Sequence, residues 1–131
     1  MADESNEPRP VTVYEVVGGM DFFTALVDRF YDRVATDPLL EPMYPEDLTE
    51  ARRHTALFLG QYWGGPTTYS DERGHPRLRM RHAPFVIGQA ERDAWLAHML
   101  ASLFEVEVHP EARQMMADYF EQASTAMINS G

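Results

Sequence analysis

The feature that most constrains the fold is a run of apolar residues at helical spacing between positions 22 and 34. Intervals of three and four residues place such a run on one face of an α-helix, which must then pack against other elements. The same spacing recurs over about residues 48–62, 91–104 and 111–128, and no segment alternates apolar and polar residues as a half-buried strand would. The first run consists of Phe22, Phe23, Leu26, Val27, Phe30, Tyr31 and Val34. The sequence therefore predicts an all-α fold.

Glycine and proline residues divide the chain into its predicted elements, because both residues end or interrupt helices. A short helix at 11–17 ends at a glycine pair, and the stretch 36–47 carries prolines that predict a compact corner with one turn of 3₁₀ helix. Residues 66–76 predict a loop. A short helix over 77–82 is limited by Pro84, which disfavours helical geometry at the residue before it. Together these segments predict five or six helices.

Length and composition indicate one acidic domain. The chain has 131 residues, which suits a single core, and residues 1–11 lack periodicity and predict a disordered N-terminal tail before a folded domain at 12–131. A net charge of -10 disfavours nucleic acid and anionic membranes as partners. All eleven cationic residues are arginines. Guanidinium groups suit paired contacts with carboxylates.

The absence of certain residues and segments narrows the chemistry further. The sequence contains no cysteine, which excludes disulfides, thiolate catalysis and cysteine-based zinc or iron–sulfur sites. No apolar run approaches the roughly 20 residues that span a bilayer. The N-terminal residues are too polar for a signal peptide, so a cytoplasmic location is expected.

Several aromatic residues with polar tips fall at positions predicted to face the core. Tyr31, Tyr44, Tyr62 and Trp95 each need a hydrogen-bond partner when buried. The ordinary explanation for any one of them is a backbone carbonyl or the surface. If three of them point into one cavity, they would instead line a pocket for a flat apolar ligand, as in many cofactor sites.

His82 is the best candidate for a metal ligand. It ends the short helix before Pro84, so its backbone can be held rigidly while the imidazole points inward, and neutral imidazole is a good ligand for iron. A half-buried histidine without a ligand role is the common alternative. Zinc is a weaker one, because His75 is seven residues away and no carboxylate completes a cluster. We assign no ligand role to His54, His98 or His109.

Four motifs together resemble a known family. These are "RFYDRVATDPLLEPMYPED", "FLGQYWGGPTTYS", "GHPRLRMRHAPF" and "ERDAWL", which follow the glycine pair at 18–19. In combination they resemble a truncated haemoglobin, most closely one of group II, from about Tyr14 to Asn129. The resemblance implies a two-over-two helical sandwich around haem b (iron protoporphyrin IX), with a short or irregular proximal helix.

The resemblance also implies roles for individual residues. His82 is similar to the proximal iron ligand, and Tyr31, Tyr44 and Trp95 are similar to the hydrogen-bond donors of the distal side. Ala51 and Thr55 match distal positions on the long helix. Arg79 or Arg81, with Tyr69 and His75 nearby, would compensate the haem propionates, although surface solvation or pairing with acidic residues would also explain these arginines. The apolar walls of the haem pocket would be Phe58, Leu59, Tyr62, Leu78, Phe85, Ile87 and Met99, each of which could equally be plain core.

Three functions remain open at this point. The first is a protein that binds dioxygen, nitric oxide or carbon monoxide at haem iron. Its release of dioxygen is expected to be slow, which would favour storage, sensing or redox chemistry over bulk transport. The second is a haem enzyme with peroxidase-like or nitric-oxide-detoxifying activity, served by an unidentified reductase. The third is a haem-free helical module with an acidic interaction surface. No catalytic residue is assigned, and a homodimer is left open.

Overall fold

The computed structural model describes residues 11–130, and in this part of the chain every regular element is a helix. The all-α prediction is therefore confirmed. The predicted tail at 1–11 lies outside the described residues except for Val11, which is exposed. The elements are α1 (Val13–Val17), α2 (Met20–Val34), the 3₁₀ helix η2 (Glu41–Met43), α3 (Thr49–Tyr62), α4 (Thr68–Arg73), α5 (Leu78–His82), α6 (Gln89–Glu105) and α7 (Pro110–Ala126).

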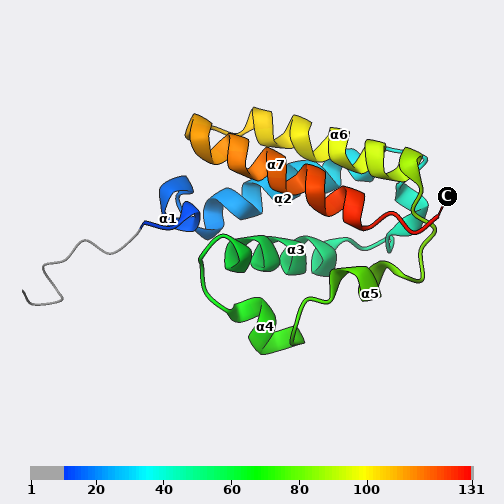
Figure 1. Cartoon of the computed structure of the whole chain (residues 1–131), viewed down its shortest axis with the longest axis horizontal. Coiled ribbons are helices and arrows are strands. Elements are labelled where there is room, and N and C mark those ends of the chain that lie inside the picture. Colours follow the sequence, from blue (N-terminus) through cyan, green and yellow to red (C-terminus); the bar gives the residue numbers. More distant parts are fainter. Residues whose placement is uncertain (1–10, 131) are drawn as a thin grey trace, which may run out of the picture.

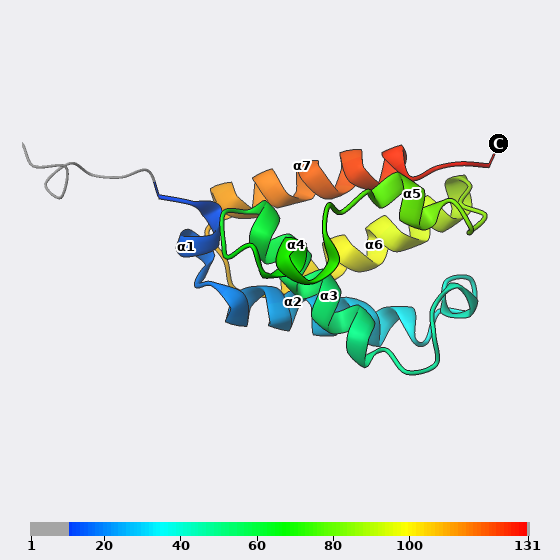
Figure 2. The same ribbon diagram turned by 90° about the horizontal axis from the view of Figure 1, so that it is seen from below.

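The four long helices form two packed pairs. Helix α2 packs against α3, α6 packs against α7, and α2 also contacts α6, which joins the pairs. Figure 1 shows α6 and α7 running side by side, with α3 below them and the short helices α4 and α5 below α3. In Figure 2 the same pairs are seen from below, with α4 lying over α3 and α5 close to the end of α7. This arrangement confirms the predicted two-over-two sandwich.

Helix α2 supplies the centre of the core. All seven apolar residues predicted to share its inner face are buried. Burial of each large side chain contributes about 1.5 to 3 kcal/mol. The helix starts directly after Gly18 and Gly19, whose φ angles of 101° and 76° are costly for residues with a Cβ. This glycine pair therefore allows the sharp turn between α1 and α2.

The segment predicted as a loop contains a helix. Six residues, Thr68–Arg73, form α4, so the described chain has seven α-helices rather than five or six. Tertiary contacts hold this helix: the Gln61 amide donates to Ser70 Oγ at 2.7 Å, and its carbonyl oxygen accepts from the Ser70 backbone N–H at 3.0 Å. Tyr69, a residue of this helix, is buried. Six residues are too few to show helical periodicity in the sequence.

The proline-rich corner before α3 contains the predicted 3₁₀ turn, η2, and is tied to α6. Its Asp37 carboxylate lies 2.6 Å from His98 Nε2 and also accepts from the Leu39 backbone N–H at 2.8 Å. The hydrogen bond from His98, followed by that from Leu39, lowers the pKa of Asp37 below its ordinary value of 3.8. His98, which had no assigned role, therefore holds the corner against the bundle.

We expect Asp37→Asn to lower the melting temperature by about 3 to 5 °C at pH 7, equivalent to about 1 kcal/mol for a partly exposed pair. Because folding lowers the pKa of Asp37, the contribution is complete above the ordinary value of 3.8 and disappears as pH falls through the lower folded value. Thermal unfolding of both proteins from pH 7 to pH 2.5 measures this. A stability difference that stays constant down to pH 2.5 would contradict the assignment. Glu46→Gln, an exposed position outside the pair, is the control.

No helix in the described part of the chain is both long and apolar enough to cross a membrane.

Candidate functional site

His82 is the last residue of α5, and its ring has one free nitrogen. The Nδ1 atom lies 2.6 Å from the backbone carbonyl oxygen of Leu78, one turn earlier. A carbonyl oxygen can only accept, so Nδ1 carries the hydrogen and Nε2 is left with its lone pair. Nε2 has no hydrogen-bond partner among residues 11–130, and the side chain is only half-buried. The ring is thus held in the tautomer and orientation that a metal ligand needs.

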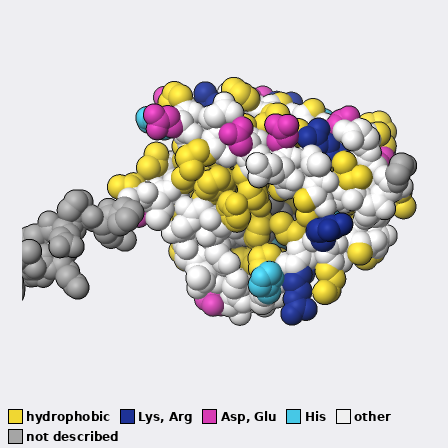
Figure 3. Space-filling view, viewed as in Figure 1, with side chains coloured by type: hydrophobic (Ala, Val, Ile, Leu, Met, Phe, Trp, Pro, Cys, Tyr) yellow, Lys and Arg dark blue, Asp and Glu magenta, His cyan; other side chains and the backbone are white. Residues whose placement is uncertain are grey.

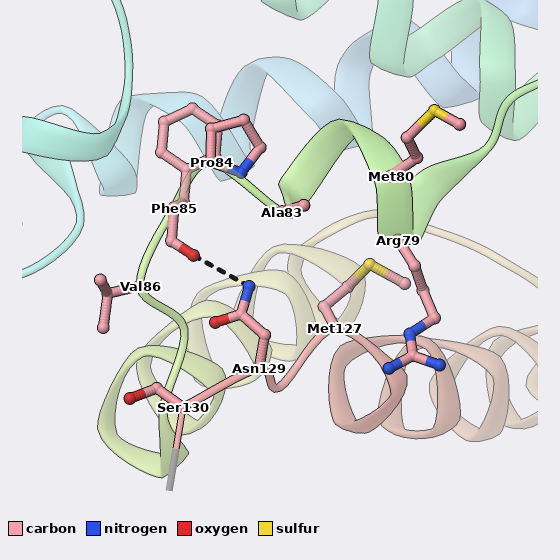
Figure 4. A pocket seen from close by; sticks show the side chains of 9 residues that line it. All are labelled: Arg79, Met80, Ala83, Pro84, Phe85, Val86, Met127, Asn129 and Ser130. Atoms are coloured by element: carbon pink, nitrogen blue, oxygen red, sulfur yellow. Dashed lines mark hydrogen bonds between the residues drawn. The ribbon is translucent and has the colours of Figure 1, made fainter.

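The C-terminal segment fixes the chain that follows His82. Asn129 Nδ2 donates to the carbonyl oxygens of Phe85 at 2.9 Å and His82 at 3.3 Å, while Asn129 Oδ1 accepts from the Ile87 backbone N–H at 2.9 Å. The Asn129 backbone N–H donates to the Ile87 carbonyl at 2.8 Å. Figure 4 shows Asn129 reaching toward Phe85. Sequence reasoning missed this residue, since an asparagine 47 positions from His82 carries no local signal.

We expect Asn129→Ala to raise the amide hydrogen-exchange rate of Ile87 at least about tenfold, because the loss of a hydrogen bond of about 1.4 kcal/mol corresponds to that factor. Asn129→Asp keeps the acceptor for Ile87 and loses the donors to His82 and Phe85, so it should protect the Ile87 amide better than alanine does. Exchange measured by mass spectrometry or NMR checks both variants. Equal protection in the wild type and Asn129→Ala would contradict the positioning role.

Three aromatic residues with polar tips meet between α2, α6 and the proline-rich corner. Tyr31 from α2 and Tyr44 from the corner pack edge to face with ring centroids 5.6 Å apart, and the Tyr31 hydroxyl lies 2.9 Å from Thr55 Oγ1 on α3. Burial raises the pKa of Tyr44, an effect opposed by a hydrogen bond with Trp95 of α6. Phe30 supports the Trp95 ring at a centroid distance of 5.3 Å. The structure therefore brings together the predicted set of Tyr31, Tyr44, Thr55 and Trp95.

These phenols stay protonated at physiological pH. Burial raises the pKa of Tyr31 above its ordinary value of 10.0, although Thr55 and the nearby Arg52 guanidinium act in the opposite direction. Arg52 lies 5.9 Å from the centre of the Tyr31 ring and pairs with Asp28 and Asp32. Tyr31 and Tyr44 are therefore neutral hydroxyl groups that can donate a hydrogen bond to a ligand.

The remaining predicted pocket residues differ in how far they are buried. Helix α3 carries Ala51 and Phe58, both half-buried, and Phe58 packs edge to face on Tyr69 at 5.5 Å. Figure 3 shows a hollowed face with hydrophobic side chains at its centre and a histidine at its rim. The buried predicted residues are Leu59, Tyr69, Ile87 and Met99, the half-buried one besides Phe58 is Leu78, and the exposed ones are Tyr62 and Phe85.

The predicted propionate partners lie in different surroundings. Arg81 Nε donates to the Pro76 carbonyl at 2.7 Å and its Nη2 to that of Arg73 at 3.3 Å, so this side chain fixes the connection between α4 and α5. Arg79 lines a groove of 550 Å³ beside the end of α7, which neither Leu78 nor His82 lines. His75 is exposed. The structure does not gather these residues around His82, and their propionate role stays a prediction.

Comparisons with known proteins agree with this geometry. A family model described as bacterial-like globin matches residues 12–129. The haemoglobin of the thermophilic bacterium Chloroflexus aurantiacus is 56% identical, with a TM-score of 0.90 over 92% of this chain and 99% of that one. Group 2 truncated haemoglobin YjbI of Bacillus subtilis is 44% identical over 88% of this chain and 87% of its own length. A truncated oxygen-avid haemoglobin structure from Bacillus subtilis is 43% identical, with a TM-score of 0.86 over 91% of this chain and all of that one (100%).

The helical sandwich and the half-buried histidine at the end of α5 define a globin. The chain belongs to the bacterial-like globin family and, within it, to the group II truncated haemoglobins. Membership of this family implies a haem cofactor.

The donor set around His82 fits that cofactor. Among residues 11–130 no three His, Asp or Glu side chains gather as a protein-built metal site would require. A single imidazole with a free Nε2 would instead suit a haem iron, which needs few ligands from the protein. The apolar lining of the hollow in Figure 3 suits the porphyrin faces.

Proposed function

We propose that this protein holds haem b through His82 and binds dioxygen, and also nitric oxide and carbon monoxide, with slow release of dioxygen. The observation that carries the proposal is the hydrogen bond from His82 Nδ1 to the Leu78 carbonyl, because it leaves Nε2 free to bind iron. Bound haem would supply a ferrous iron with one open coordination position for a diatomic gas. The similar haemoglobin from Bacillus subtilis is described as oxygen-avid, which supports the choice of ligand.

Tyr31, Tyr44 and Trp95 would determine how long dioxygen stays. Their O–H and N–H groups are the hydrogen-bond donors of the distal cluster, and each net hydrogen bond to a neutral donor contributes about 0.5 to 1.5 kcal/mol. The Tyr31 hydroxyl is hydrogen-bonded to Thr55. The Thr55 hydroxyl would hold the phenol in place while the phenolic hydrogen points to the ligand. The small side chain of Ala51 would leave a route open for the ligand to enter.

Reconstitution with haemin tests the proposal directly. The purified chain should bind one equivalent and give a Soret band, and its ferrous form should give a distinct spectrum with carbon monoxide. A chain that folds, as judged by circular dichroism, and shows no Soret band would support the haem-free interaction module instead.

A second candidate, peroxidase-like turnover, is favoured by the pair Tyr62 and Tyr119. Their ring centroids are 4.2 Å apart, Tyr62 is 52% exposed, and burial together with the nearby Tyr62 raises the pKa of Tyr119 to about 12. An exposed phenol packed against Phe58 could give up an electron and a proton to the oxidised site, and an external reductant would then return both to the tyrosyl radical that is left. Nitric oxide chemistry would need the same kind of electron supply from a reductase.

If this candidate holds, Tyr62→Phe should lower the rate of guaiacol oxidation by hydrogen peroxide at least about threefold, since a loss of about 0.7 kcal/mol of transition-state stabilisation has that effect. Tyr14→Phe, which removes a hydroxyl from α1, serves as the matched control. Equal rates in the two variants and the wild type would remove Tyr62 from the reaction.

A further inference from the structure

The region around α5 has the opposite charge from the rest of the molecule. Residues 73–90 contain four arginines and two histidines without a single Asp or Glu, in a chain whose net charge is -10. Arg77 and Arg79 are exposed and form no ion pair with any residue of the described chain, whereas Arg53, on α3, is paired with Glu72. Figure 3 shows cationic side chains clustered near this end of the hollow, with acidic side chains gathered along the opposite edge. Arg77 and Arg79 therefore have no acidic partner within the described chain and are open to an outside one.

Apolar side chains lie between these cations. Met80 is 62% exposed, Val86 73% and Phe85 40%. They border the groove of 550 Å³ beside α7, whose floor includes Met127. Figure 4 shows Arg79 at one end of the groove and Phe85 with Val86 at the other. An exposed apolar centre with charged residues around it is the usual composition of a protein–protein interface. We call Arg77, Arg79, Met80, Phe85 and Val86 the α5 surface.

The exposure of these side chains decides what kind of partner fits. A small molecule in the groove would leave much of Met80 and Val86 in water, because both side chains are more than half exposed. A folded partner could cover them together with the arginines. The rest of the chain is acidic and repels acidic proteins. Such a protein would therefore dock with its acidic face on the α5 surface.

We propose that the α5 surface docks a small acidic electron-donor protein, of the iron–sulfur or flavin class. This proposal rests on the proposed haem function, since α5 ends in His82 and brings the partner close to the iron. Ferric iron needs one electron to reach the ferrous state that binds dioxygen. The reduced partner would supply that electron and would itself be oxidised by one electron. No covalent bond would be made or broken.

The test uses haem-loaded full-length protein and a plant-type [2Fe–2S] ferredoxin as the acidic probe. Titration calorimetry should give a Kd that weakens at least about tenfold between about 20 and 200 mM salt, as charge-steered binding does. Arg77→Glu should weaken binding at least about tenfold at low salt, and Val86→Ser at least about threefold. NMR shift changes on ferredoxin addition should centre on residues 77–86.

Matched controls separate this surface from general charge effects. Arg29→Glu on α2 makes the same charge change, and Val16→Ser on α1 removes an exposed valine; both should change Kd less than about twofold. Equal effects of Arg77→Glu and Arg29→Glu would overturn the proposal, as would binding to phosphatidylglycerol vesicles with none to ferredoxin. The Soret band of each sample reports haem loading independently, so failure of the haem proposal is distinguishable from failure of docking.

Discussion

His82→Gly is expected to lose the ordinary Soret spectrum of the haem-loaded protein and to release haem at least about tenfold faster, because the imidazole is the only protein ligand we assign to the iron. The fold should survive, since the ring is half-buried and its one hydrogen bond runs to a carbonyl of its own helix. Haem transfer to an excess of apomyoglobin, followed by absorbance, measures the release rate. Free imidazole added at millimolar concentration should restore much of the spectrum by filling the space left by the side chain.

The control for this experiment is His75→Gly, seven residues earlier. His75 is exposed, and its Nδ1 accepts a hydrogen bond only from the Arg77 backbone N–H at 3.3 Å. The His75→Gly protein should keep the Soret spectrum, because a residue beside the propionates is not a ligand of the iron. A His82→Gly protein that keeps the wild-type spectrum without imidazole would show that another residue binds the iron.

Local patterns were enough to predict the elements that carry the site. The inner face of α2 follows from spacing alone, because one helix period fixes which residues face the core. The position of His82 at the end of α5 follows from Pro84, which limits the short helix. Spacing could not show that Tyr31, Tyr44 and Trp95 lie together; the family resemblance supplied that expectation.

Features held by long-range contacts could not be predicted. Helix α4 depends on Gln61, and the segment after His82 depends on Asn129, whose partners are backbone atoms more than 40 positions away. Backbone carbonyls are the same at every residue, so the sequence does not show which ones a side chain will reach. The sequence likewise could not show that Arg81 donates to the carbonyls of Arg73 and Pro76. Its role beside a propionate stays a prediction.

Tyr31→Phe and Trp95→Phe should each speed the release of dioxygen from the ferrous protein, by up to about tenfold for a hydrogen bond of about 1.4 kcal/mol. The double variant should release it up to about a hundredfold faster if the two donors act independently. The donors come from different helices, α2 and α6, and Phe30 packs against both rings, so some coupling between the two substitutions is expected. Stopped-flow mixing of the oxygenated protein with dithionite and carbon monoxide measures the rates.

The release rates of further variants separate the contribution of Tyr31 from that of Thr55. Removing the Tyr31 hydroxyl frees Thr55, which can then offer its own hydroxyl to the ligand. The double variant Tyr31→Phe with Thr55→Val should therefore release dioxygen faster than Tyr31→Phe alone. Tyr14→Phe, whose ring stacks on Phe23 away from this cluster, is the control and should leave the rate unchanged. Unchanged release in both Tyr31→Phe and Trp95→Phe would show that retention of dioxygen does not depend on these donors. In that case the buried phenols would be explained by their contacts with each other and with Thr55 alone.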